Sequence, residues 1–123
     1  LDKGDLLYTW SATFGPHIWT GTKAIFHYHI WKIDFDTKQI DKMFLYYFLE
    51  ADKTQLLANT NGSTMIHITK SNMENKIIYL PPESIQTELG QMLNKLDNQI
   101  QRHNFKIKLL TELKQFLLKN MFI

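Results

Sequence analysis

The 123-residue chain contains no cysteine. This excludes a disulfide scaffold and thiolate metal sites, and it fits a reducing compartment, so we predict a cytoplasmic protein. No apolar run approaches the ~20 residues of a membrane span, and no membrane partner is expected. The first residue is Leu1 rather than Met, and residues 2–5 are typical of a turn. We therefore expect the chain to begin inside a longer protein.

Sequence motifs of known enzymes are also missing. The chain has no G-x-S-x-G motif, no phosphate-binding loop and no dinucleotide fingerprint. His27 and His29 alternate on one predicted strand, but no other histidine has a spacing that would complete a metal site. We expect no enzymatic activity, no cofactor and no metal. A small metal-dependent hydrolase built on these two histidines is the weakest alternative.

The chain carries only a small excess of positive charge. Lysine and arginine number 14 against 12 acids, which gives a net charge of +2. Residues 98–111 hold Arg102, Lys106 and Lys108 without any acid. This pattern permits contact with phosphates, although a strong nucleic-acid binder usually has a larger basic excess.

The last third of the chain has apolar residues at helical spacing. Leu80-Pro81-Pro82 precedes a helix expected over residues 83–121, which would be roughly 58 Å long. A domain formed by residues 1–82 is too small to cover it, so part of its apolar stripe must face another helix or chain. The predicted partner-helix residues, with one polar member, are Ile85, Leu89, Met92, Leu96, Ile100, His103, Ile107, Leu110, Leu113, Leu117 and Met121.

His103 stands where the stripe should be apolar, within Gln101-Arg102-His103-Asn104. A polar residue on such a seam can fix the register of helix pairing at some cost in stability. The alternative is an ordinary solvated stretch in the middle of a helix. Both interpretations stay open at this point.

For residues 1–82 we predict a partial, β-rich domain with short helices. For residues 83–123 we predict a separate long helix of the coiled-coil type. The overall class is therefore α+β. Strands are expected at residues 5–10, 23–33 and 76–80 because each is rich in β-branched and aromatic residues. The middle strand is bulky on both faces, which predicts that it is covered on both sides.

Helices in the first part are expected to be short. Asp41 is a plausible N-cap for an aromatic helix over residues 42–49, and Leu56 and Leu57 suggest a second one. Ser71 is a candidate cap for a single turn through Glu74. Residues 65–68 suggest a short strand.

Two polar loops, at residues 10–23 and 59–70, are candidate contact surfaces. Asn, Ser, Thr and Lys side chains bind base edges and phosphates, although any solvated loop has a similar composition. The candidate DNA-binding residues, including two from the helix, are Ser11, Thr13, His17, Trp19, Lys23, Asn61, Ser63, Thr64, His67, Lys70, Arg102 and Lys106.

Several segments follow one another in a specific order. They are Gly-Asp-Leu-Leu at 4–7, a bulky segment at 25–32, Phe-Leu-Tyr-Tyr-Phe-Leu at 44–49, Gly-Ser-Thr-x-x-His-Ile-Thr-Lys at 62–70, and Leu-Pro-Pro at 80–82 before the long helix. This series resembles the later part of one target-recognition domain, with its spacer helix, in the specificity subunit of type I restriction–modification systems. Many members carry a Leu and two Glu where this chain has Glu83-Ser84-Ile85 before Gln86.

The resemblance implies a non-catalytic protein whose β-rich domain contacts half of a split target in double-stranded DNA. The helix would pair antiparallel with a second spacer helix, from the other half of the subunit or from a second copy. It would also dock methyltransferase (modification) subunits and, through them, the restriction subunit. The resemblance further predicts that the chain is part of a longer subunit. The runner-up is a coiled-coil scaffold with a small α+β head and no role in DNA recognition.

Overall fold

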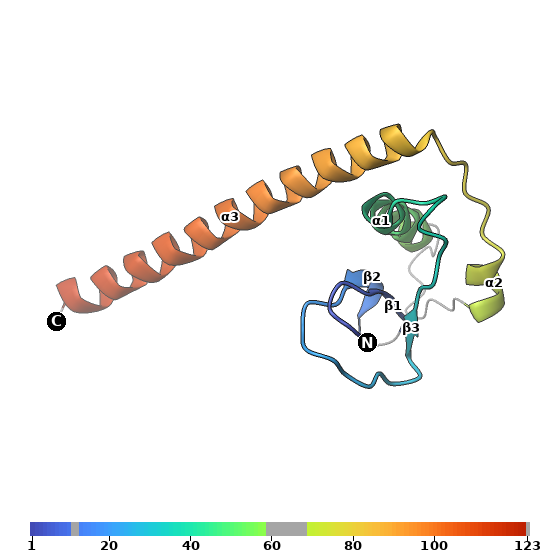
Figure 1. Cartoon of the computed structure of the whole chain (residues 1–123). Coiled ribbons are helices and arrows are strands. Elements are labelled where there is room, and N and C mark those ends of the chain that lie inside the picture. The colour runs from blue at the N-terminus through green and yellow to red at the C-terminus, as the bar shows by residue number, and fades with distance from the viewer. Residues whose placement is uncertain (11–12, 59–68, 123) are drawn as a thin grey trace. The chain divides into compact units, whose positions relative to one another are not determined.

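The computed structural model describes residues 1–10, 13–58 and 69–122. Strands β1 (Leu6–Trp10), β2 (Phe14–Ile18) and β3 (Ile30–Lys32) form an antiparallel sheet in the order β2-β1-β3. The helices are α1 (Lys42–Ala58), α2 (Lys70–Glu74) and α3 (Glu83–Met121) (Figure 1). The predicted α+β class is confirmed.

The chain divides into two compact units, which we call the head (Leu1–Gly90) and the distal helix (Gln91–Ile123). The first two turns of α3 therefore belong to the head. No helix in the described part of the chain is both long and apolar enough to cross a membrane.

The core of the head lies between β1 and α1. Side chains alternate between the two faces of a strand, so Leu6 and Tyr8 point to the same side. There they form a cluster with Leu45 and Leu49 of α1, and all four are buried. Full burial of such a side chain is worth roughly 1.5–3 kcal/mol. α1 accordingly lies over the sheet (Figure 1).

The predicted strand over residues 23–33 is wrong for most of its length. Ala24 exchanges backbone hydrogen bonds with Leu1, beside the start of β1, whereas Ile30 pairs with Thr9 near the end of β1. The intervening residues therefore run along the sheet opposite to β3, and a turn closed by the Ile30 N–H and the His27 carbonyl (2.9 Å) reverses the chain. Ile25 is fully exposed, so this segment is not covered on both sides.

Other elements differ from the sequence prediction in their type or bounds. Residues 14–18, expected in a loop, form β2, and residues 76–80 are irregular instead of forming a strand. The two predicted helices at 42–57 are the single helix α1, and Asp41 caps it as expected, with its Oδ1 accepting from the Phe44 N–H at 3.0 Å. Thr69, not Ser71, caps α2. The suggested strand at 65–68 lies outside the described residues.

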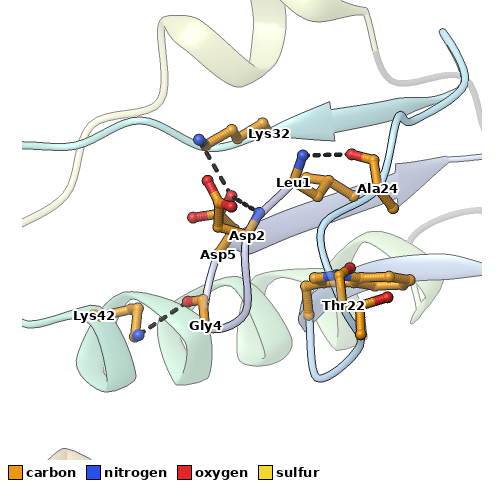
Figure 2. A network of polar contacts seen from close by, with 9 residues as sticks. Leu1, Asp2, Gly4, Asp5, Thr22, Ala24, Lys32 and Lys42 are labelled. Carbon is orange, nitrogen blue, oxygen red and sulfur yellow. Dashed lines mark hydrogen bonds and ion pairs between the residues drawn. The ribbon is translucent and has the colours of Figure 1, made fainter.

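A polar network fixes the start of the chain against the rest of the head (Figure 2). The Lys42 ammonium donates to the Gly4 carbonyl (2.9 Å), and Lys32 lies 3.2 Å from the Asp5 carboxylate. The Asp5 side chain accepts the Asp2 N–H at 2.8 Å. That hydrogen bond, together with Lys32, lowers the pKa of Asp5. These contacts set where β1 begins and therefore which of its residues face α1.

Candidate nucleic-acid interface

The sheet of the head has two distinct ends. At the first, β1 begins, and Gly4 is held by Lys42 at the start of α1. At the second, which we call the hairpin end, β1 finishes at Trp10 while β2 and β3 begin at Phe14 and Ile30. α1 runs from the first end towards the hairpin end, because the later α1 residue Lys53 packs against Gly15 of β2.

Gly15 is required where Lys53 crosses it. Its backbone has φ of +119°, and an added Cβ would lie 2.5 Å from Lys53 Cδ. A side chain at this position would therefore be strained and would clash with the lysine stem. The glycine allows β2 and α1 to approach closely beside the hairpin end.

A row of polar side chains lies on the sheet face opposite the core. Thr9 Oγ1 is 3.0 Å from Thr13 Oγ1 and 3.0 Å from His17 Nε2. Thr13 and His17 are exposed. Two predicted contact residues are thus brought together by Thr9, which sequence reasoning missed. The alternation of Leu6, Tyr8 and Trp10 with Leu7 and Thr9 was the signal that could have placed Thr9 on this face.

Trp19 and Lys23 do not join this polar row. The Trp19 backbone bonds to Gly4 and Asp5, so it lies at the end of the sheet where β1 begins. Its indole N–H donates to the Thr22 carbonyl at 2.8 Å. Lys23 is exposed next to Ala24, which is bonded to Leu1. The structure therefore divides the first predicted contact loop between two ends of the sheet.

The second predicted loop is described only at its end. Lys70 opens α2 and lies 3.8 Å from Glu74, with both side chains largely exposed, so this ion pair adds little stability. Five of the predicted contact residues lie outside the described residues: Ser11, Asn61, Ser63, Thr64 and His67.

The charge of the head is unevenly distributed along the sequence. Residues 6–33, which include all three strands, contain Lys23, Lys32 and three histidines but no Asp or Glu. Acids from other segments lie close to the sheet, because Asp5 pairs with Lys32 and the carboxylates of Asp52 and Glu50 act on Tyr8. The absence of acids therefore describes this stretch of sequence and not the whole surface of the sheet.

The start of α3 is fastened to the start of α1 by a buried glutamine. Gln86 is 1% exposed, and its Oε1 accepts the Asp41 N–H at 2.9 Å. Its Nε2 donates to the carbonyls of Gln39 (3.1 Å) and Pro81 (2.9 Å). The side chain thus uses both donors and one acceptor, which makes its burial tolerable.

Gly90 extends this attachment by one turn. A Cβ there would lie 3.0 Å from Met43 Cβ and 3.1 Å from Asp41 Oδ1. The absence of a side chain lets the two helices approach at this point. Gln86 and Gly90 together orient the first part of α3 on the head, at the end of the sheet away from the hairpin end.

Beyond Gly90, the apolar stripe of α3 is in solvent. Leu96, Ile100 and Leu110, for example, are at least half exposed. The other predicted seam residues beyond Gly90 are exposed as well: Met92, Ile107, Leu113, Leu117 and Met121. Of the two seam residues in the head, Ile85 is exposed and Leu89 is half-buried. Arg102, His103 and Lys106 are exposed on the same helix.

His27 and His29 stack on each other with ring centroids 4.8 Å apart. His29 also packs edge-on against Trp10 at 4.7 Å. Within residues 1–10, 13–58 and 69–122, no three His, Asp or Glu side chains are grouped as a metal site requires.

The head and α3 together form a small α+β domain continued by a long amphipathic helix. The family described as "Type I restriction modification DNA specificity domain" matches residues 1–113, and the chain belongs to that family. The resemblance expected from the sequence is thereby confirmed.

Two characterised relatives are specificity subunits. The chain is 29% identical over 122 residues to the type I restriction enzyme MjaVIII specificity subunit of Methanocaldococcus jannaschii, covering 99% of this chain and 29% of the relative. It is 25% identical over 96 residues to the type I restriction enzyme EcoBI specificity subunit of Escherichia coli, covering 78% and 20%. The chain thus spans less than a third of either relative. No solved structure matches it.

Proposed function

We propose that the chain is part of a type I specificity subunit and recognises DNA without catalysing a reaction. The observation that carries this proposal is the family match over residues 1–113, which covers the head and most of α3. In this proposal the head contacts half of a bipartite target in double-stranded DNA. Methyl transfer and cleavage belong to partner chains.

The DNA contacts proposed for the head come from polar side chains that can bind base edges and from lysines that can bind phosphates. Thr13 and His17 are exposed and hydrogen-bonded through Thr9, so their polar atoms lie close together at the surface. Hydroxyl, imidazole and amide groups can bind base edges, whereas lysines bind phosphates. We propose Asn61, Thr64 and Lys70 as further contacts on the basis of their residue types.

The distal helix is proposed to pair with a second spacer helix and to dock modification subunits. Its exposed seam supports this, because large apolar side chains in water favour association. Beyond Ile107 the apolar face also includes Leu109, Phe116 and Leu118, which is wider than a two-stranded seam requires. We propose one contact with a helix and another with a larger protein surface.

Binding to random-sequence duplex DNA across a salt series tests DNA recognition. The logarithm of the affinity should fall with the logarithm of salt concentration by roughly 0.9 per phosphate contact. Reversing the charge at Arg102 and Lys106 should lower affinity for all sequences without changing base preference. Matched reversal of Lys114 and Lys119, elsewhere on the same helix, is the control.

Target preference provides a second test, in the longer subunit to which the chain is proposed to belong. Replacing Asn61 or Thr64 should relax one position of the target at a cost of about 1–3 kcal/mol, whereas replacing Lys70 should weaken all sequences alike. Unchanged preference after exchanging residues 59–70 between two subunits of different specificity would exclude this loop.

The scaffold alternative is favoured by the same exposed stripe, since a coiled-coil protein needs only that surface. It predicts self-association in sedimentation experiments without salt-dependent duplex binding. Duplex binding by the chain therefore separates the two functions.

A further inference from the structure

Three consecutive rings are presented at the hairpin end, immediately before β3. We call His27, Tyr28 and His29 the ring tip. Tyr28 is 72% exposed, and its ring centroid lies 4.2 Å from that of His27 and 4.0 Å from that of His29. Because His27 and His29 also stack on each other, Tyr28 lies against one side of this pair and leaves most of its own surface in solvent, where a partner can reach it.

The ring tip is tied to the core by a continuous series of ring contacts. His29 packs on Trp10 (4.7 Å), Trp10 on Trp31 (5.7 Å), and Trp31 on the buried Tyr8 (6.3 Å). The backbone turn is closed by the Ile30 N–H and the His27 carbonyl. Tyr28 is thus linked to the core through neighbouring rings, and such contacts limit the conformational entropy that its side chain would lose on binding.

Three observations favour a nucleic acid as the partner of this tip. The tip lies at the hairpin end, at which the polar row containing Thr13 also begins. It belongs to residues 6–33, which contain no acid. Its exposed groups are flat rings, which stack on bases whatever their sequence.

We propose that Tyr28 contacts bases of the bound DNA duplex, with its ring stacked at a base step that the binding opens. The inference rests on the proposed function and adds an element that the two polar loops do not include. Apolar and aromatic side chains inserted at a base step unstack it and bend the duplex. The ring tip would then favour targets with a deformable step opposite Tyr28, in addition to any base-edge contacts.

The test uses the full chain and 40-base-pair duplexes with a randomised centre, from which bound sequences are selected. Adenines of a selected duplex are then replaced one at a time with 2-aminopurine, whose fluorescence rises when it is unstacked. Tyr28→Ala should weaken binding about 5- to 140-fold, the range for loss of one base–ring stack. It should also abolish the fluorescence change at one position, while Tyr28→Phe preserves both.

Tyr79→Ala is the matched control, because Tyr79 is 90% exposed and lies in the irregular segment before Pro81, outside the sheet. It should change affinity by less than about twofold. Full affinity of Tyr28→Ala, or loss of binding in Tyr28→Phe, overturns the stacking contact while leaving DNA recognition intact. Failure of the unmodified chain to bind any duplex overturns the proposed function and this inference together.

Discussion

The head and the distal helix use similar side chains in opposite environments. Leu45 in the head is 4% exposed, whereas Leu110 in the distal helix is 55% exposed. Both occupy helical positions within apolar stripes. The head is thus stabilised by contacts within itself, while the stripe of the distal helix has its apolar surface available for a partner. An amphipathic pattern therefore locates an apolar face but does not say what covers it.

The largest expected contrast is between these two leucines. Leu45→Ala should lower the free energy of unfolding by about 2–5 kcal/mol, because it leaves a cavity in the core. Leu110→Ala should change it by less than about 0.5 kcal/mol in the unassociated chain. Urea unfolding followed by tryptophan fluorescence measures the head alone, since Trp10, Trp19 and Trp31 all lie there. Equal effects would mean that the stripe is already buried in solution, in an assembly that unfolds together with the head.

The next contrast concerns the attachment of α3 to the head. Gln86→Leu should lower the free energy of unfolding by about 2–4 kcal/mol, because it leaves the Asp41 N–H and two carbonyls buried without partners. Glu88→Leu, an exposed change on the same turn, is the control and should have a small effect. An equally mild Gln86→Leu would show that water replaces the glutamine.

A third experiment asks whether the polar position on the seam sets the register of helix pairing. His103→Leu should strengthen association, by up to about 1.5–3 kcal/mol if the side chain becomes fully buried, and should mix registers. Because the chain has no cysteine, a spin label at Gln115→Cys is unique and reports the distance between paired helices. Asn104→Leu, one residue off the seam, is the control. A single unchanged distance in His103→Leu would make this stretch ordinary surface.

The smallest expected effect comes from the Tyr8 hydroxyl, which is buried and has no hydrogen-bond partner among the described residues. Burial, with added repulsion from Asp52 and Glu50, raises the pKa of Tyr8 to about 12. The folded state therefore holds this proton more tightly than the unfolded state. The contribution of the protonated Tyr8 hydroxyl to the free energy of unfolding is complete below pH about 10 and is lost as pH rises towards about 12.

Tyr8→Phe should remove that component of the pH dependence. At neutral pH it should change the free energy of unfolding by about 1 kcal/mol or less, because no residue in the described part of the chain forms a hydrogen bond with this hydroxyl that would be lost. Unfolding curves at pH 8, 10 and 11.5 for both proteins measure the difference. Tyr47→Phe, on the half-buried surface of α1, serves as the reference.

Sequence patterns and capping residues predicted an element correctly where its own residues decide its conformation. The β-rich pattern of residues 5–10 gave β1, Asp41 capped α1, and Pro82 with Glu83 opened α3 where expected. They failed at residues 23–33, since a run of bulky residues does not reveal that the chain reverses at His27. They also missed β2, because Gly15 and Pro16 are typical of turns but are tolerated in a strand paired on one side.

The candidate site shows the same division. Residue type selected Thr13 and His17, and the structure brings them together, but it needed Thr9 to do so. The grouping of Thr13 with Trp19 failed because β2 separates them along the sheet. The division of residues 1–82 and 83–123 into domains stays a prediction, as do the individual DNA contacts.

Local patterns in the chain were enough to predict the α+β class, the extent of α3 and the family, because helical spacing, caps and motif order are properties of neighbouring residues. Tertiary structure alone decided the hairpin end, the polar row on Thr9 and the attachment through Gln86 and Gly90. The attachment of α3, for example, joins Gln86 to Gln39, 47 positions earlier in the chain. Such pairings depend on how the strands and helices pack, and no local pattern in the chain encodes them.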